Sequence, residues 1–197
     1  MAVKGAGRLR VAAESQRSQI VPSAVMGMLI FVITEMMFFA GLVSAFMIVR
    51  ASAMVWPPPN QPRLPLEETA VNTAALLLSG LVLFFARRTF QRDRQRATMP
   101  LMISMLLGAF FVVFQGFEWV GLIREGLTLT SSTLGSFFYL IVGIHALHAV
   151  VALGVLAYAW LRLQRGWLTS SQLAVAEIFW YLVVGVWPVL YLTVYMA

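Results

Sequence analysis

Residues 134–161 read LGSFFYLIVGIHALHAVVALGVLAYAWL and contain no Asp, Glu, Lys or Arg. A helix of about 20 mostly apolar residues crosses a bilayer, so this stretch predicts a transmembrane helix. Four further stretches meet the same criterion, and the chain is expected to be an all-α membrane protein. The five predicted helices form one bundle and lie at about 20–49, 70–86, 99–123, 134–161 and 172–196. We expect a single membrane domain over residues 20–197, preceded by a polar segment over residues 1–19.

The composition agrees with a surface that faces lipid. Hydrophobic residues make up 60% of the 197 residues and charged residues 11%, whereas soluble domains carry about a quarter charged residues. The net charge of +6 comes from Lys and Arg placed between apolar stretches, so it predicts membrane topology and no nucleic-acid partner. The absence of cysteine excludes disulfides, thiolate zinc sites, iron–sulfur clusters and cysteine-ligated copper.

The basic residues predict the orientation of the bundle. Eleven of the fourteen fall on one side of the predicted helices: Lys4, Arg8, Arg10, Arg17, Arg87, Arg88, Arg92, Arg94, Arg96, Arg162 and Arg165. Arg50, Arg63 and Arg124 fall on the other. The positive-inside rule therefore predicts a cytoplasmic N-terminus and a periplasmic C-terminus. The connection 50–69 contains five prolines, which predicts an extended surface loop.

Four ionisable residues lie deep inside predicted spans, where an unpaired charge is costly, and Glu177 lies near the start of the fifth span. Glu35 is in the first, Glu118 in the third, and His145 and His148 in the fourth. Positions three apart share a helix face, so His145 and His148 face together, as do Gln115 and Glu118. The simplest interpretation is a polar cluster between helices in which a carboxyl contacts an imidazole.

Two chemical interpretations stand beside the structural one. Intramembrane carboxylates serve proton paths, so Glu35 or Glu118 could relay protons. A mononuclear metal site built from His145, His148 and one Glu is also geometrically possible. Two His on one face of one helix cannot sandwich a haem, because its axial ligands approach from opposite sides. No Gly-rich phosphate loop, Ser/His/Asp order or His-Glu-x-x-His sequence is present. We therefore expect no catalytic, cofactor-binding or metal-binding residue in this chain, with the metal site kept as an alternative.

Several short motifs occur in a fixed order along the chain. They are TEMMFFAG at 34–41, LPLE at 64–67, NTAALLLSG at 72–80, QGFEW at 115–119 and GIHALH at 143–148. Together they resemble subunit III of the haem–copper terminal oxidases, which include the cytochrome c and quinol oxidases. The resemblance covers most of the membrane part and implies the short five-helix form of that subunit.

The resemblance implies a non-catalytic accessory subunit of a respiratory oxidase in the bacterial cytoplasmic membrane. Such a subunit packs beside the catalytic subunit I and subunit II, binds phospholipid, stabilises subunit I and supports proton uptake during aerobic electron transport. Haem and copper are expected in the partner subunits. The candidate polar or proton-related residues inside the bundle remain Glu35, Gln115, Glu118, His145 and His148, and the loop motif comprises Pro65, Glu67 and Asn72.

One departure from the family concerns the last helix. The family reads Trp-His-Phe-x-Asp-x-x-Trp, whereas residues 180–187 read WYLVVGVW. Tyr181 thus replaces the family's His, and Val184 replaces its Asp. The departure leaves a second possibility, a subunit III homologue associated with a nitric oxide reductase. A stand-alone transporter fits less well because no internal repeat is present, and a membrane metal or haem protein is the remaining alternative.

Overall fold

The computed structural model describes residues 21–56 and 66–196, and within these ranges all regular elements are helical. The elements are α2 (Ser23–Ser52), α3 (Leu66–Arg92), α4 (Thr98–Arg124), α5 (Thr133–Gln164), α6 (Ser170–Leu190) and the π-helix η1 (Tyr191–Tyr195). Five of these helices, with η1 continuing the last, are long and apolar enough to cross a membrane. The all-α class and the five predicted spans are confirmed. The segment 1–19, its basic residues and the loop residue Pro65 lie outside the described residues.

Helix α3 extends beyond the predicted span at both ends. It begins at Leu66 and ends at Arg92, whereas the sequence predicted 70–86. Glu67 is therefore in the first helical turn and Asn72 is buried within the helix, so assigning these two residues to a loop is wrong. Hydropathy detects only the apolar centre of a span. The acidic first turn and the basic last turn complement the helix dipole and continue the helix into the interface.

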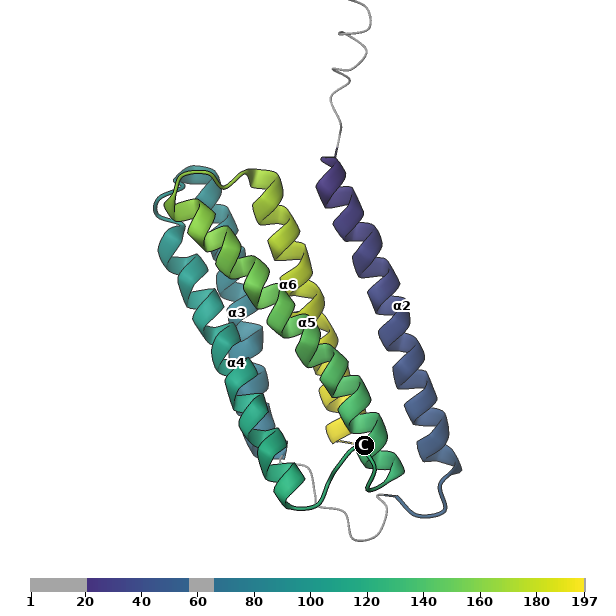
Figure 1. Cartoon of the computed structure of the whole chain (residues 1–197). Helices are drawn as coiled ribbons and strands as arrows, with labels where there is room; N and C mark the ends of the chain where they lie inside the picture. Colours follow the sequence, from purple (N-terminus) through teal and green to yellow (C-terminus); the bar gives the residue numbers. More distant parts are fainter. Residues whose placement is uncertain (1–20, 57–65, 197) are drawn as a thin grey trace, which may run out of the picture.

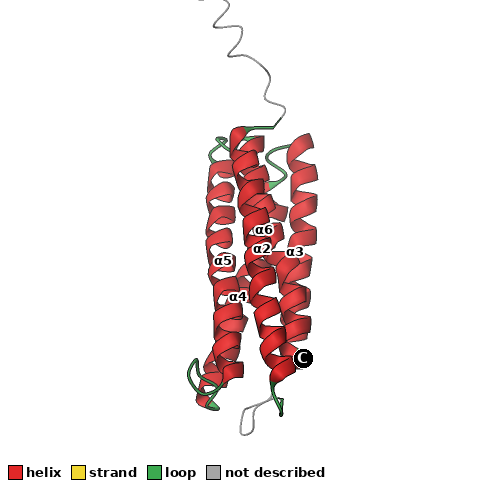
Figure 2. Cartoon of the chain, turned by 90° about the vertical axis from the view of Figure 1, so that its right-hand side faces the viewer, coloured by secondary structure: helices red, strands yellow, loops and turns green. Residues whose placement is uncertain are grey.

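The helices run side by side along one axis (Figures 1 and 2). The start of α2, the α3–α4 connection and the α5–α6 connection share one end of the molecule, and the C-terminus lies at the other (Figure 1). The arginines of the two connections therefore gather at the end where α2 begins. This is the alternation that the basic residues predict.

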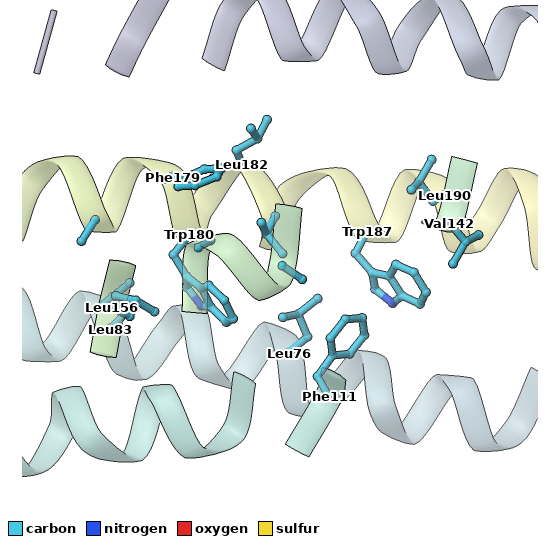
Figure 3. Close-up of a cluster of buried hydrophobic side chains, with 14 of the residues drawn as sticks. Leu76, Leu83, Phe111, Val142, Leu156, Phe179, Trp180, Leu182, Trp187 and Leu190 are labelled. Carbon is cyan, nitrogen blue, oxygen red and sulfur yellow. The ribbon is translucent and has the colours of Figure 1, made fainter. Parts of the chain in front are cut away.

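Most of the core lies among α3, α4, α5 and α6, and Phe39 and Phe46 of α2 complete it. Trp180 and Trp187 extend from α6 into a cluster with Leu76 and Phe111 (Figure 3), and these four side chains are almost completely buried. A Cβ atom at Gly108 of α4 would lie 2.5 Å from the Trp180 ring. The glycine thus lets α4 approach α6 as closely as packing allows.

Local sequence signals account for several helix ends. Ser132 caps α5 by accepting a hydrogen bond from the Gly135 N–H (3.0 Å). Thr169 and Gln172 form a capping box at the start of α6. Pro188 lies inside α6 and lacks the N–H that would bond to the Val184 carbonyl, and the backbone becomes π-helical from Tyr191.

Candidate functional site

A hydrogen-bonded network surrounds Glu118, which is 7% exposed. The Thr69 hydroxyl of α3 lies 3.0 Å from each carboxyl oxygen of Glu118. On α4, Gln115 Nε2 donates to Glu118 Oε2 (2.7 Å) and to the Tyr195 hydroxyl (2.9 Å). Asn72 Nδ2 lies 3.5 Å from Gln115 Oε1. These bonds join α3, α4 and η1 inside the bundle.

A second set of contacts extends the network to the C-terminal part of α6. The Thr73 hydroxyl donates to the Thr69 carbonyl (2.7 Å) and accepts from Trp187 Nε1 (2.8 Å). The Trp187 ring stacks on His145, with 5.1 Å between ring centroids and 29° between planes. Helix α6 therefore meets α3 through hydrogen bonds and α5 through ring contact.

The second candidate pair joins α2 to α5. His148 Nε2 lies 3.1 Å from Glu35 Oε2, and both side chains are largely shielded. The rings of Phe39 and Phe179 lie edge-on to His148, at 5.5 and 6.3 Å between centroids. This environment excludes most water, so the two polar groups serve as each other's partners.

The two ring nitrogens of His148 define where a proton can reside. Nδ1 lies 2.8 Å from the Ile144 carbonyl; because a carbonyl only accepts, Nδ1 carries a hydrogen. Nε2 then either accepts from a protonated Glu35 or, in imidazolium, donates to its carboxylate. In both arrangements Nε2 faces the Glu35 carboxyl across 3.1 Å.

His145 differs from His148 despite sharing its helix face. It is 1% exposed, and its Nε2 has no hydrogen-bond partner. The residue borders a cavity of about 210 Å³ between α4 and α5, which Trp119 also lines. The Trp119 Nε1 is likewise buried without a partner. His145 thus packs as an aromatic ring rather than as half of a carboxyl pair.

The four ionisable residues do not converge on one place, which corrects the expectation of a single cluster. Glu35 contacts His148 as expected of one carboxyl and one imidazole. Glu118 instead contacts Thr69 and Gln115, and no hydrogen bond joins it to His145 in the described part of the chain. The spacing along the chain predicted that His145 and His148 share a helix face, as do Gln115 and Glu118. It could not predict how each helix is rotated toward its neighbours.

Tyr181 and Val184, the two departures from the family pattern, have separate surroundings. The Tyr181 hydroxyl donates to Glu177 Oε1 (3.3 Å), and Glu177 Oε2 lies 3.7 Å from Arg87 Nε. Val184 is apolar and packs toward Gly80, where a Cβ would lie 3.1 Å from its Cγ1. Tyr181 thus belongs to a cluster with Glu177 and Arg87 near one end of the bundle. Val184 instead packs between α6 and α3.

Sequence reasoning missed several partners in these networks. Thr69 lay in the predicted loop, and Tyr195 and Trp187 were among unremarkable aromatic residues. The signal that could have indicated them is the cost of burying Glu118 and Gln115, which requires donors on neighbouring helices. No sequence rule names which donors those are.

The described residues contain no group of three or more His, Cys, Asp or Glu that could hold a metal ion. In particular, His145 and His148 are not brought together with one Glu. The geometry therefore does not support the mononuclear metal site considered from the sequence.

Comparison with known proteins agrees with these features. The sequence model of the family "Cytochrome c oxidase subunit III" matches residues 13–197. A Nocardia farcinica protein named "Probable cytochrome c oxidase subunit 3" is 34% identical over 178 residues, covering 87% of this chain and 86% of the relative. "Cytochrome c oxidase subunit 3" of Loxodonta africana and of Rattus norvegicus are each 30% identical, covering 86% of this chain and 67% of each relative.

The fold and the buried networks define a membrane protein of five apolar helices joined through intramembrane hydrogen bonds. The matches over most of its length then place it more narrowly. The chain belongs to the cytochrome c oxidase subunit III family. Its homologues are subunits of an oxidoreductase complex of the respiratory chain, and the resemblance read from the motifs is confirmed.

Proposed function

We propose that this chain is a non-catalytic accessory subunit of a bacterial respiratory haem–copper oxidase. It lies in the cytoplasmic membrane with its N-terminus cytoplasmic and its C-terminus periplasmic. It packs beside subunit I and subunit II, which hold the haem and copper, and stabilises the catalytic subunit. The observation that carries the proposal is that its buried polar residues bond to one another between helices, as the Glu118 network does.

A role in proton uptake is supported by the Glu35–His148 pair. Aromatic rings shield the pair, and His148 Nε2 lies 3.1 Å from Glu35 Oε2, within reach for a proton to pass between imidazole and carboxyl. A shielded group that exchanges one proton can pass protons toward a partner that consumes them. The proton reaches the reaction centre through subunit I, so this chain changes the supply of protons and not the chemistry.

Phospholipid binding is supported by a groove between α2 and α6. The groove measures about 690 Å³ and is lined almost entirely by apolar side chains, with Val32 and Met36 on α2 and Leu182 and Val186 on α6. An acyl chain fits such a lining, and a lipid held there would contact both helices.

Removing this chain from the complex tests the accessory role. The purified oxidase is compared with the same oxidase from a strain that lacks this chain. We expect unchanged haem content and initial electron transfer, but faster loss of activity during turnover and on warming. The proposal fails if the haem spectrum disappears with the chain while subunits I and II remain assembled.

Affinity purification identifies the partner of this chain. Affinity purification of the full chain in mild detergent should yield haem-containing subunits that reduce oxygen. If the copurified catalytic subunit reduces nitric oxide and not oxygen, the chain serves a nitric oxide reductase instead. Haem or stoichiometric metal that remains with the isolated chain would contradict the cofactor-free assignment.

Orientation is tested with single cysteines at two exposed positions. Gln95→Cys lies in the α3–α4 connection and Thr130→Cys in the α4–α5 connection. An impermeant thiol reagent added to intact spheroplasts should label Thr130→Cys and not Gln95→Cys. The reverse pattern, or equal labelling, contradicts the proposed topology.

A further inference from the structure

The arginines at the end of α3 divide into two groups. Arg87 is tied to α6, because it contacts Glu177 and donates to the Ser170 carbonyl (3.0 Å). Arg94 donates to the Leu168 carbonyl (3.4 Å). Arg88 and Arg92 are exposed, and among the described residues no carboxylate forms an ion pair with either.

Arg88 and Arg92 border the same cavity. It measures about 430 Å³ and is also lined by Phe85, Asp93 and Arg96. Asp93 contributes a negative charge, but its Oδ2 contacts Arg96 Nε (3.1 Å) and its Oδ1 accepts from the Arg96 backbone N–H (3.4 Å). Three guanidinium groups and one carboxylate leave the cavity with two unbalanced positive charges.

An apolar surface leads directly into this cavity. Leu78, Leu81 and Phe85 are exposed large side chains on α3, and at helical spacing they share one face with Arg88 and Arg92. The face extends about 10 Å from Leu78 to Phe85 at the helical rise. This length lies within the roughly 15 Å of hydrocarbon in one leaflet.

From this juxtaposition we propose that the α3–α4 end binds an anionic phospholipid. Its phosphate contacts Arg88 and Arg92, and one acyl chain lies along Leu78, Leu81 and Phe85. A lipid fits better than a free anion or an acidic peptide because the apolar face and the positive cavity are continuous. In the proposed orientation the site lies in the cytoplasmic leaflet, where anionic headgroups attract arginine.

The proposal rests on the lipid-binding part of the proposed function and adds a headgroup class and a site distinct from the α2–α6 groove. The guanidinium groups form two charge-assisted contacts to phosphate oxygens. Each basic residue near an anionic surface contributes about 1 kcal/mol. Losing two of them should therefore weaken binding about 30-fold, since 1.4 kcal/mol is a tenfold change.

The test uses the full chain in zwitterionic detergent, titrated with phosphatidylglycerol or phosphatidylcholine while thermal unfolding is followed. We expect phosphatidylglycerol to stabilise the protein at lower concentration than phosphatidylcholine. The double variant R88Q/R92Q should need about 30-fold more phosphatidylglycerol for half-maximal stabilisation. R124Q/R165Q, which removes the same charge from the α4 end and the α5–α6 turn, should respond like the unaltered chain.

Several outcomes would overturn the proposal. Phosphatidylglycerol preference that survives R88Q/R92Q, or that falls equally in R124Q/R165Q, shows that these two arginines form no specific site. Stabilisation by inorganic phosphate alone at the same concentration assigns the cavity to a free anion. If the unaltered chain shows no preference for phosphatidylglycerol and R88Q/R92Q no longer copurifies with the catalytic subunit, the cavity binds a protein partner instead.

A further variant separates this site from the proposed function. R88K/R92K keeps both charges and should retain most of the preference for phosphatidylglycerol, which shows that the fold is intact. If R88Q/R92Q loses that preference but still copurifies with an active oxidase, the accessory role stands independently. If the unaltered chain binds both lipids equally and still copurifies, only the anionic site fails.

Discussion

Helix α2 and the four-helix group α3–α6 are held by different means. Of the residues in α2, only Phe39 and Phe46 are buried, whereas α5 alone buries eleven. Helix α2 packs mainly along α6 and more sparsely against α5, and an apolar groove of about 690 Å³ opens between α2 and α6. The four-helix group is joined by close packing and by the Glu118 network, while the Glu35–His148 pair joins α2 to α5.

The difference teaches how membrane helices associate when lipid and side chain are equally apolar. Without a hydrophobic force between helices, close packing and hydrogen bonds determine which helices stay together. The α3–α6 group has both, whereas α2 buries only Phe39 and Phe46 and leaves wide apolar faces exposed. We therefore expect α2 to separate before the group unfolds, and the following variants test that order.

The largest effect should come from Trp180→Ala. Trp180 is fully buried in the four-helix group, and its Nε1 donates to the Ser79 hydroxyl (3.0 Å). We expect the free energy of unfolding in detergent to fall by about 3 kcal/mol, the lower end for a buried aromatic residue. Denaturant titration of the helical signal measures it. The exposed Trp167→Ala serves as the control, and an equal loss there would contradict the assignment.

A matched pair of glycines compares the packing of the two regions directly. A Cβ at Gly108 would overlap the Trp180 ring, whereas a Cβ at Gly41 of α2 would meet nothing within 4 Å. Gly108→Ala should cost about 1 to 3 kcal/mol through overpacking. Gly41→Ala should be neutral or slightly stabilising, since alanine favours a helix. Equal melting temperatures for the two variants would show that α4 and α6 are not closely packed.

Glu118→Leu tests the network within the four-helix group. The change removes the buried carboxyl to which the Thr69 hydroxyl and Gln115 Nε2 donate. Losing these two hydrogen bonds, each contributing about 0.5 to 1.5 kcal/mol, should lower the free energy of unfolding by about 1 to 3 kcal/mol. Glu118→Gln retains an acceptor oxygen and should lose less. Both values come from denaturant titration of the purified chain. If Glu118→Gln is as unstable as Glu118→Leu, the carboxylate charge matters more than the hydrogen bonds.

The smallest effect should come from the histidines. His148→Leu removes the partner of Glu35 and should loosen α2 by about 0.6 to 2 kcal/mol, the range for a hydrogen bond between membrane helices. His145→Leu should cost less, since its Nε2 has no partner. Hydrogen exchange within α2 should rise for His148→Leu alone.

The histidine variants also separate a structural role from a chemical one. Electron transfer in assembled complexes of His148→Leu should continue, because no redox centre is altered, but at a lower rate if the Glu35–His148 pair supports proton uptake as proposed. Immediate and complete loss of turnover while the complex stays assembled would show that His148 acts in the chemistry.

The sequence by itself determined the number of helices, their class and the end at which the described arginines gather. These features are local: each span must satisfy its backbone hydrogen bonds internally, and hydropathy records that constraint residue by residue. The same local signal underestimated α3, because charged residues such as Glu67 and Arg92 continue a helix beyond its apolar centre. The motifs also determined the family.

Only the tertiary structure decided which polar residue meets which. Glu35 and Glu118 looked equivalent as lone carboxyls within apolar spans, yet one contacts His148 and the other Thr69 and Gln115. His145 and His148 share a helix face, yet only His148 reaches a carboxylate. These outcomes depend on the rotation and relative height of neighbouring helices. Close packing of residues far apart in the chain, such as Trp180 against Gly108, sets both, and no local pattern encodes them.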